Sequence, residues 1–88
     1  MNFENQVYLD ELRKADAVFH QSLTPIAKAL GLNVGRVASA FQGVGRINKK
    51  TIDAIAEHCG CDPLYLELRL VERQIAAQFS ENLDTRSN

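Results

Sequence analysis

Residues 26–50, IAKALGLNVGRVASAFQGVGRINKK, decide the fold, because their small and apolar residues are spaced for two short helices that cross at a tight turn. Ala27 supplies the small side chain that such a crossing needs on the first helix, and Gly31 ends that helix and turns the chain. Asn33 is placed to cap the second helix. The stretch therefore predicts two helices, over residues 23–30 and 34–42.

The rest of the chain has the same helical spacing, since apolar residues recur every three or four positions. Either Ser22 or Thr24 can cap the first helix of the crossing pair, Asn48 can cap a later one, and Asp62 followed by Pro63 opens the last. Three further helices are predicted, over residues 4–19, 49–59 and 63–79. We expect an all-α fold of five helices, with one domain over residues 1–79 and a flexible tail over residues 80–88.

Charge is distributed unevenly along the chain. Residues 21–50 carry five Lys or Arg and no Asp or Glu, whereas the whole chain has a formal net charge of −1. An acidic polymer such as DNA responds to the field of the surface that it meets, within about 8–10 Å at ordinary salt. The overall charge therefore does not exclude nucleic acid, and it argues against a protein that coats any duplex without preference.

Length and composition exclude several classes of protein. From 88 residues we expect one small domain without a secretory signal, and the sequence has no apolar run of the roughly 18 residues that a membrane span needs. Cys59 and Cys61 are too close in sequence to bridge one another, and with one nearby histidine they do not complete a zinc site. No spacing supports a catalytic arrangement. We expect a cytoplasmic protein that is not an enzyme and has no cofactor or metal.

Residues 22–66 resemble the helix-turn-helix of the lambda repressor-like, Cro-type (XRE) family of bacterial and phage regulators. The resemblance rests on Ile26-Ala27, Gly31 and Val37 at their spacing, on Gly43, and on the segments TIDAIAEHCG and CDPLYL. It implies a five-helix lambda repressor-like DNA-binding domain with an extended C-terminal helix. It also implies that residues 34–42 form a recognition helix in the major groove of double-stranded DNA, with two copies on half-sites about one helical turn apart.

The outward positions that match the family's DNA-reading residues hold few strong hydrogen-bond donors. These positions are Asn33, Val34, Gly35, Arg36, Ala38, Ser39 and Gln42. Apolar side chains can contact the thymine methyl group, so we expect modest base discrimination, with T favoured at Val34 and Ala38. The alternative is that Val34 and Ala38 belong to a surface for a protein partner.

The basic loop after the recognition helix is the stronger sign of a nucleic-acid ligand. Lysines in the first turn of a helix oppose its dipole, and Lys49 and Lys50 occupy that place. A bound phosphate removes the conflict, so Arg46, Asn48, Lys49 and Lys50 are predicted to form a phosphate clamp. The alternative is a solvated basic loop with no ligand.

The last predicted helix has more apolar residues than one core face accommodates. Its stripe is predicted to form a twofold dimer interface through Leu64, Leu68, Val71, Ile75 and Phe79. The alternative is that this face folds over residues 4–19 within a monomer.

Together these observations predict a sequence-specific transcriptional regulator, a small phage, plasmid or bacterial repressor that acts as a homodimer. Two alternatives stay open. One is the antitoxin of a toxin–antitoxin module, since some antitoxins share this fold and a segment similar to residues 60–65, GCDPLY. The other is a protein-interaction module of the same fold that does not bind DNA.

Overall fold

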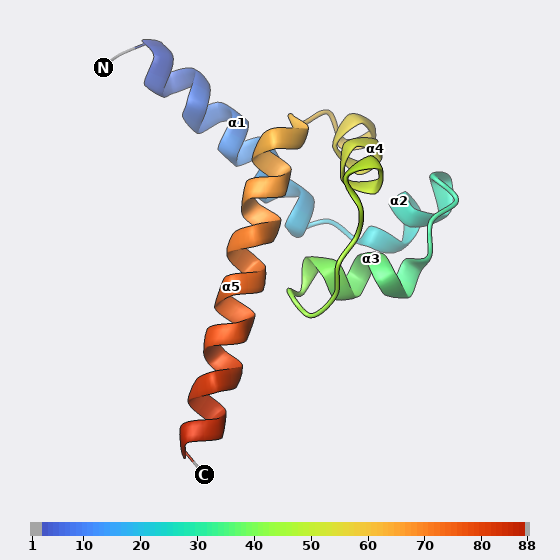
Figure 1. The fold of residues 1–88 in the computed structure, drawn as a ribbon. Helices are drawn as coiled ribbons and strands as arrows, with labels where there is room; N and C mark the ends of the chain where they lie inside the picture. Colours follow the sequence, from blue (N-terminus) through green and yellow to red (C-terminus); the bar gives the residue numbers. More distant parts are fainter. Residues whose placement is uncertain (1–2, 88) are drawn as a thin grey trace.

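The computed structural model describes the backbone of residues 3–87 and the side chains of residues 6–80, and this part of the chain forms five α-helices and no strand. The prediction of an all-α fold with five helices is confirmed. In chain order (Figure 1) the helices are α1 (Phe3–Phe19), α2 (Leu23–Ala29), α3 (Val34–Phe41), α4 (Lys49–Cys59) and α5 (Pro63–Ser87).

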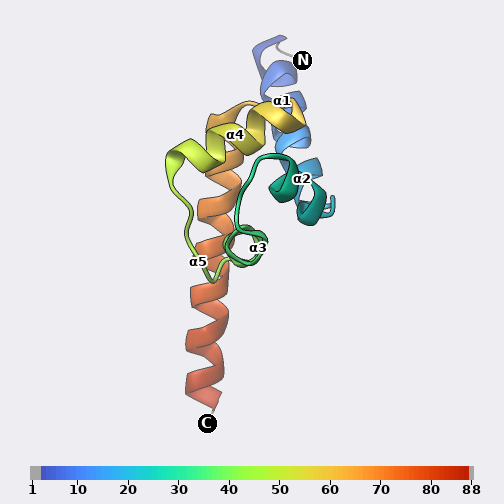
Figure 2. The ribbon, with the colours of Figure 1, turned by 90° about the vertical axis from the view of Figure 1, so that its right-hand side faces the viewer.

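The long helix α5 organises the molecule. Helix α1 packs against its N-terminal half, and α3 and α4 pack against it from another side, with α2 resting on α3 and α4. In both views the C-terminal half of α5 extends beyond the other helices (Figures 1 and 2). Figure 2 shows α3 nearly end-on, below α4. The two short helices of the crossing pair are therefore held on one side of a single long helix.

One core receives a fully buried residue from every helix. Val18 of α1, Ala27 of α2, Val37 of α3, Ile55 of α4 and Leu66 of α5 are each at most 1% exposed. Burial of a large aliphatic side chain contributes about 1.5–3 kcal/mol, so these contacts are the main stabilising term. Ala27 has no exposed surface at all, which is the result expected where α2 and α3 cross closely.

Local capping explains where α3, α4 and α5 begin. The side-chain oxygen of Asn33 accepts a hydrogen bond from the backbone N–H of Arg36 at 2.9 Å, and that of Asn48 accepts one from Thr51 at 2.8 Å. Asp62 caps α5 in a similar way. Ser22 occupies the N-cap position of α2, but its side chain makes no capping bond. Two of the predicted caps thus stabilise the elements that carry the basic residues.

Helix α5 is longer than the sequence predicted. The expectation was an end near Phe79 and a flexible tail over residues 80–88, whereas the helix continues to Ser87. Residues 80–87 contain no Gly or Pro, so nothing in them interrupts the helical hydrogen bonds. Asn88 lies outside the described residues.

Candidate nucleic-acid interface

The starts of α3 and α4 lie on either side of an open hollow of about 360 Å³, called the cleft below. The turn before α3 and the loop before α4 complete its walls. The polar side chains that line the cleft are Asn33, Arg36, Arg46, Asn48 and Thr51. The cleft therefore brings together residues from two capped helix starts and two arginines.

Both helix starts present positive potential to the cleft. Each cap satisfies one backbone N–H, that of Arg36 or of Thr51, and the earlier N–H groups of each helix have no partner within the helix. An α-helix carries roughly half a positive charge at its N-terminus. Neither α3 nor α4 has an acidic residue in its first turn. The arrangement suits an anion with several oxygen atoms, such as a phosphate.

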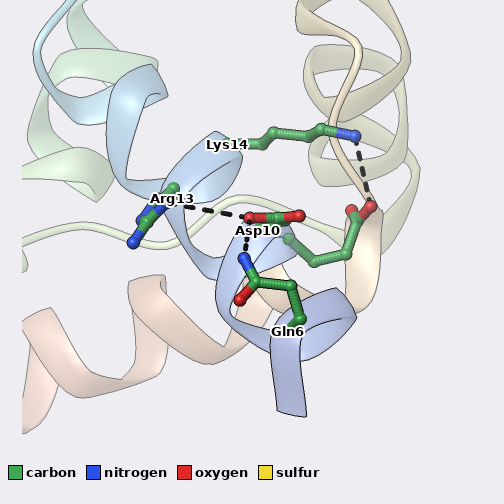
Figure 3. Close-up of polar contacts among 5 residues, drawn as sticks. Gln6, Asp10, Arg13 and Lys14 are labelled. Carbon is green, nitrogen blue, oxygen red and sulfur yellow. Dashed lines mark hydrogen bonds and ion pairs between the residues drawn. The ribbon is translucent and has the colours of Figure 1, made fainter. Parts of the chain in front are cut away.

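The basic residues at the cleft differ from those of α1 in their surroundings. On α1, Arg13 lies 3.8 Å from Asp10 and Lys14 lies 3.3 Å from Glu11 (Figure 3). All ion pairs among the side chains of residues 6–80 lie within α1, within α5 or between these two helices. Arg36 and Arg46 are exposed and have no such pair in this part of the chain. Their charge is therefore available to a ligand.

The structure brings together only part of the predicted DNA-binding set. Asn33, Arg36, Arg46 and Asn48 line the cleft. Lys49 and Lys50 follow directly in the first turn of α4 and are exposed. Thr51, which the sequence analysis did not select, also lines the cleft. Its place as the third residue after the Asn48 cap is the sequence signal that could have identified it.

The outer face of α3 holds the remaining predicted residues, with one correction. Gly35 and Gln42 are exposed, and Ala38 and Ser39 are half-buried. Val34 was predicted to point outward, but it is half-buried and packs against the core. The reason is helical spacing, since Val34 lies three residues before the buried Val37 and therefore shares its face.

The loop between α3 and α4 is held from two sides. The backbone N–H groups of Val44 and Gly45 donate to the carbonyl oxygen of Ser39 at 3.1 and 3.2 Å. On the other side, Nε2 of Gln74 on α5 donates to the carbonyl oxygen of Gly45 at 3.2 Å. Arg46 follows directly, so its backbone position depends on both α3 and α5.

A stripe of apolar side chains on α5 stays exposed. Its members are between 41% and 68% exposed and lie on the side of α5 opposite the buried Leu66 and Leu70. We call this set the α5 stripe, and it consists of the five predicted interface residues Leu64, Leu68, Val71, Ile75 and Phe79.

Helix α1 packs on a different face of α5. Tyr8 meets Tyr65 edge-on at 5.6 Å between ring centroids, and the guanidinium of Arg73 lies 4.6 Å from the ring centroid of Phe19. Arg69 Nε lies 2.8 Å from Asp16 Oδ1, although it is not aligned for a hydrogen bond. These contacts leave the α5 stripe uncovered, so the alternative in which it folds over α1 is wrong for this structure.

The two cysteines belong to the interior. Cys61 is buried and Cys59 packs against the core from a half-buried position, and both thiols are free. Burial raises the pKa of both thiols, and the neighbouring Cys59 raises the pKa of Cys61 further. A raised pKa favours the neutral thiol, so both cysteines act as small apolar side chains.

No family model, curated protein or solved structure matches this chain. Among the described residues, no helix has the length and hydropathy that crossing a membrane requires.

Proposed function

We propose that this protein is a sequence-specific DNA-binding transcriptional regulator. The observation that supports the proposal best is the cleft, where Arg36 and Arg46 lie beside two helix starts that carry no acidic residue. Phosphate contacts supply much of the affinity of a protein for DNA and fix its orientation on the duplex. With a phosphate in the cleft, the start of α3 lies next to the duplex.

Helix α3 is proposed to enter the major groove as the recognition helix. Gly35 and Ser39 on its outer face and Gln42 at its C-cap leave one long polar side chain, that of Gln42, to form hydrogen bonds with a base edge. Such a surface discriminates modestly between bases, and most of the affinity comes from the phosphates. We therefore expect a repressor that acts by occupying its site and so blocking a promoter.

Self-association through the α5 stripe is part of the proposal. None of its five members lines the cleft, so a second copy on the stripe leaves the cleft open. Light scattering at tens of micromolar should give about twice the protomer mass of 9.8 kDa. A mass near 9.8 kDa under those conditions would reject the dimer.

A second candidate function is that of an antitoxin, which binds a protein partner as well as DNA. The exposed apolar α5 stripe favours it, because a stripe of this kind also suits a partner of different sequence. Co-purification with a small basic protein encoded beside this one, in place of self-association, would distinguish the antitoxin from the homodimeric repressor.

DNA binding is tested by selecting bound sequences from random duplex DNA and titrating salt on the selected sequence. If all five basic residues of residues 21–50 reached phosphates in both protomers of a dimer, the slope of log K against log salt would approach about −9. Fewer of them will reach a phosphate, so we expect a slope of about −5 to −7. An association constant that hardly changes between low and moderate salt would refute the phosphate contacts.

A pair of double variants separates the cleft from overall charge. Arg36→Ala with Lys49→Ala should preserve folding, weaken duplex binding by about tenfold or more, and reduce the slope by about 0.9 for each phosphate that is no longer neutralised. Arg13→Ala with Lys14→Ala removes the same charge from α1 and should change both quantities far less. Equal reductions in the two double variants would contradict a specific role for the cleft.

A further inference from the structure

Arg46 lines two hollows. The first is the cleft, and the second is an open hollow of about 280 Å³ lined by residues of α3, the loop, α4 and α5. Its lining combines apolar side chains, Ile52, Leu70 and Val71 among them, with polar ones. The guanidinium group of Arg46 can therefore approach either an anion in the cleft or a side chain that lines the second hollow.

The charged group that faces Arg46 across the second hollow is Glu67 of α5. Its side chain is half-buried, and it forms no ion pair within 4.0 Å among the side chains of residues 6–80. Apolar walls reduce the screening of the attraction between the two charges. Glu67 thus attracts Arg46 without a fixed contact.

The backbone beside Arg46 is fixed while its side chain is exposed. Gln74 donates a hydrogen bond to the carbonyl oxygen of Gly45, and Ser39 accepts hydrogen bonds from the same loop. The Arg46 side chain can therefore move between the two hollows only by a change of rotamer, because the backbone beside it is held in place.

We propose that Glu67 is a counter-charge that competes with bound phosphate for Arg46, and that Gln74 is the residue that positions Arg46 between the two hollows. Helix α5 thereby sets the anion affinity of the cleft from outside it. The proposal deepens the proposed function and rests on it for its physiological ligand. It predicts that the cleft binds phosphate less tightly than its charge allows.

The test replaces Glu67 without changing its size. Glu67→Gln should tighten binding of the selected duplex at low salt by about two- to fivefold, which is the range expected for one partly screened charge pair. The matched control is Glu57→Gln, which removes the same charge from an exposed position near the C-terminal end of α4, where it lines neither the cleft nor the second hollow. The excess over the control should disappear in an Arg46→Ala background and should shrink as salt is raised.

Gln74→Ala tests the positioning role. It should weaken duplex binding and lower the salt slope by about 0.9 for each phosphate that Arg46 no longer neutralises. In the Arg46→Ala background it should have no further effect on either quantity. An equal weakening in both backgrounds would mean that Gln74 acts only on stability, and that would overturn its assignment.

A second readout keeps the proposal testable without DNA. The side-chain Nε–H resonance of Arg46 in the free protein should shift with Glu67→Gln and stay in place with Glu57→Gln. No difference between these two variants would overturn the proposal, whether or not the protein binds a duplex. Absence of duplex binding by the wild type, together with the Arg46 shift, would refute the proposed function while the pairing of Arg46 and Glu67 stands.

Discussion

Replacing Gly43 with alanine should destabilise the protein more than the same change at another glycine of similar backbone conformation. Gly43 has φ +88°, and a Cβ atom built there would lie 2.5 Å from the carbonyl oxygen of Arg73 and 3.0 Å from Cβ of Ala77 on α5. Gly60 has φ +76° and nothing within 4 Å of the same position. The two glycines thus share a backbone conformation that would strain an alanine, and they differ in their contact with α5.

The two costs can be separated. An L-residue at positive φ costs about 1–2 kcal/mol, and this applies to both positions. Forcing a methyl group against α5 backbone adds about 1–3 kcal/mol, and this applies to Gly43 alone. A protein of 88 residues has a total stability of about 4–13 kcal/mol, so Gly43→Ala should remove a large share of it.

Urea unfolding followed by circular dichroism measures both variants under one protocol. Gly43→Ala should unfold at least about 1 kcal/mol more easily than Gly60→Ala, which corresponds to a Tm lower by about 4 °C or more. Gly31→Ala, at φ +69° with open space, should match Gly60→Ala. If all three variants are destabilised equally, the close approach of the loop to α5 does not constrain the protein.

Three other changes test separate features. Ala27→Leu should overpack the crossing of α2 and α3 and cost about 1–3 kcal/mol in urea unfolding, and a neutral result would mean that the crossing is loose. Asn48→Ala should cost about 1 kcal/mol by loss of the α4 cap, whereas Ser22→Ala, which removes no capping bond, should cost almost nothing by the same measurement. For Cys61, burial raises the pKa from its ordinary value of 9.0, so the folded protein holds the thiol proton that the unfolded chain releases; this contribution is complete below about pH 9 and is lost as the pH rises through the raised pKa. Under reducing conditions, the unfolding free energy of Cys61→Ala should therefore fall less steeply above pH 9 than that of the wild type, and parallel curves would contradict the assignment.

The helices were predictable from sequence because their signals are local. Asn33, Asn48 and Pro63 mark helix starts within three residues of the groups that they affect, and apolar spacing marks the faces between them. The end of α5 was missed because residues 80–87 lack an apolar pattern, although they also lack any residue that ends a helix. Their polar composition was interpreted as the sign of a tail, whereas the absence of Gly and Pro was the feature that indicated a continuing helix.

The sequence predicted Asn33, Arg36, Arg46 and Asn48 within a larger DNA-binding set, but it predicted neither Thr51 nor the cleft itself. Arg36 and Arg46 are ten positions apart in sequence. Both line the cleft because the loop that carries Arg46 is held against α5 through Gly43 and Gln74. Those contacts join distant parts of the chain, so no local pattern specifies them. Val34 lies near the edge of the buried face of α3, where spacing alone does not separate an inward side chain from an outward one.

Val71 belongs to two surfaces at once, since it is 43% exposed on the α5 stripe and also forms a wall of the hollow shared by Arg46 and Glu67. In the proposed dimer, a second copy seated on Val71 would change the dielectric surroundings of Arg46 and Glu67. Thermodynamic linkage is reciprocal, so whatever factor the proposed self-association applies to the affinity for DNA, DNA must apply to self-association. The proposed regulator would then respond to its own concentration more steeply than independent protomers allow.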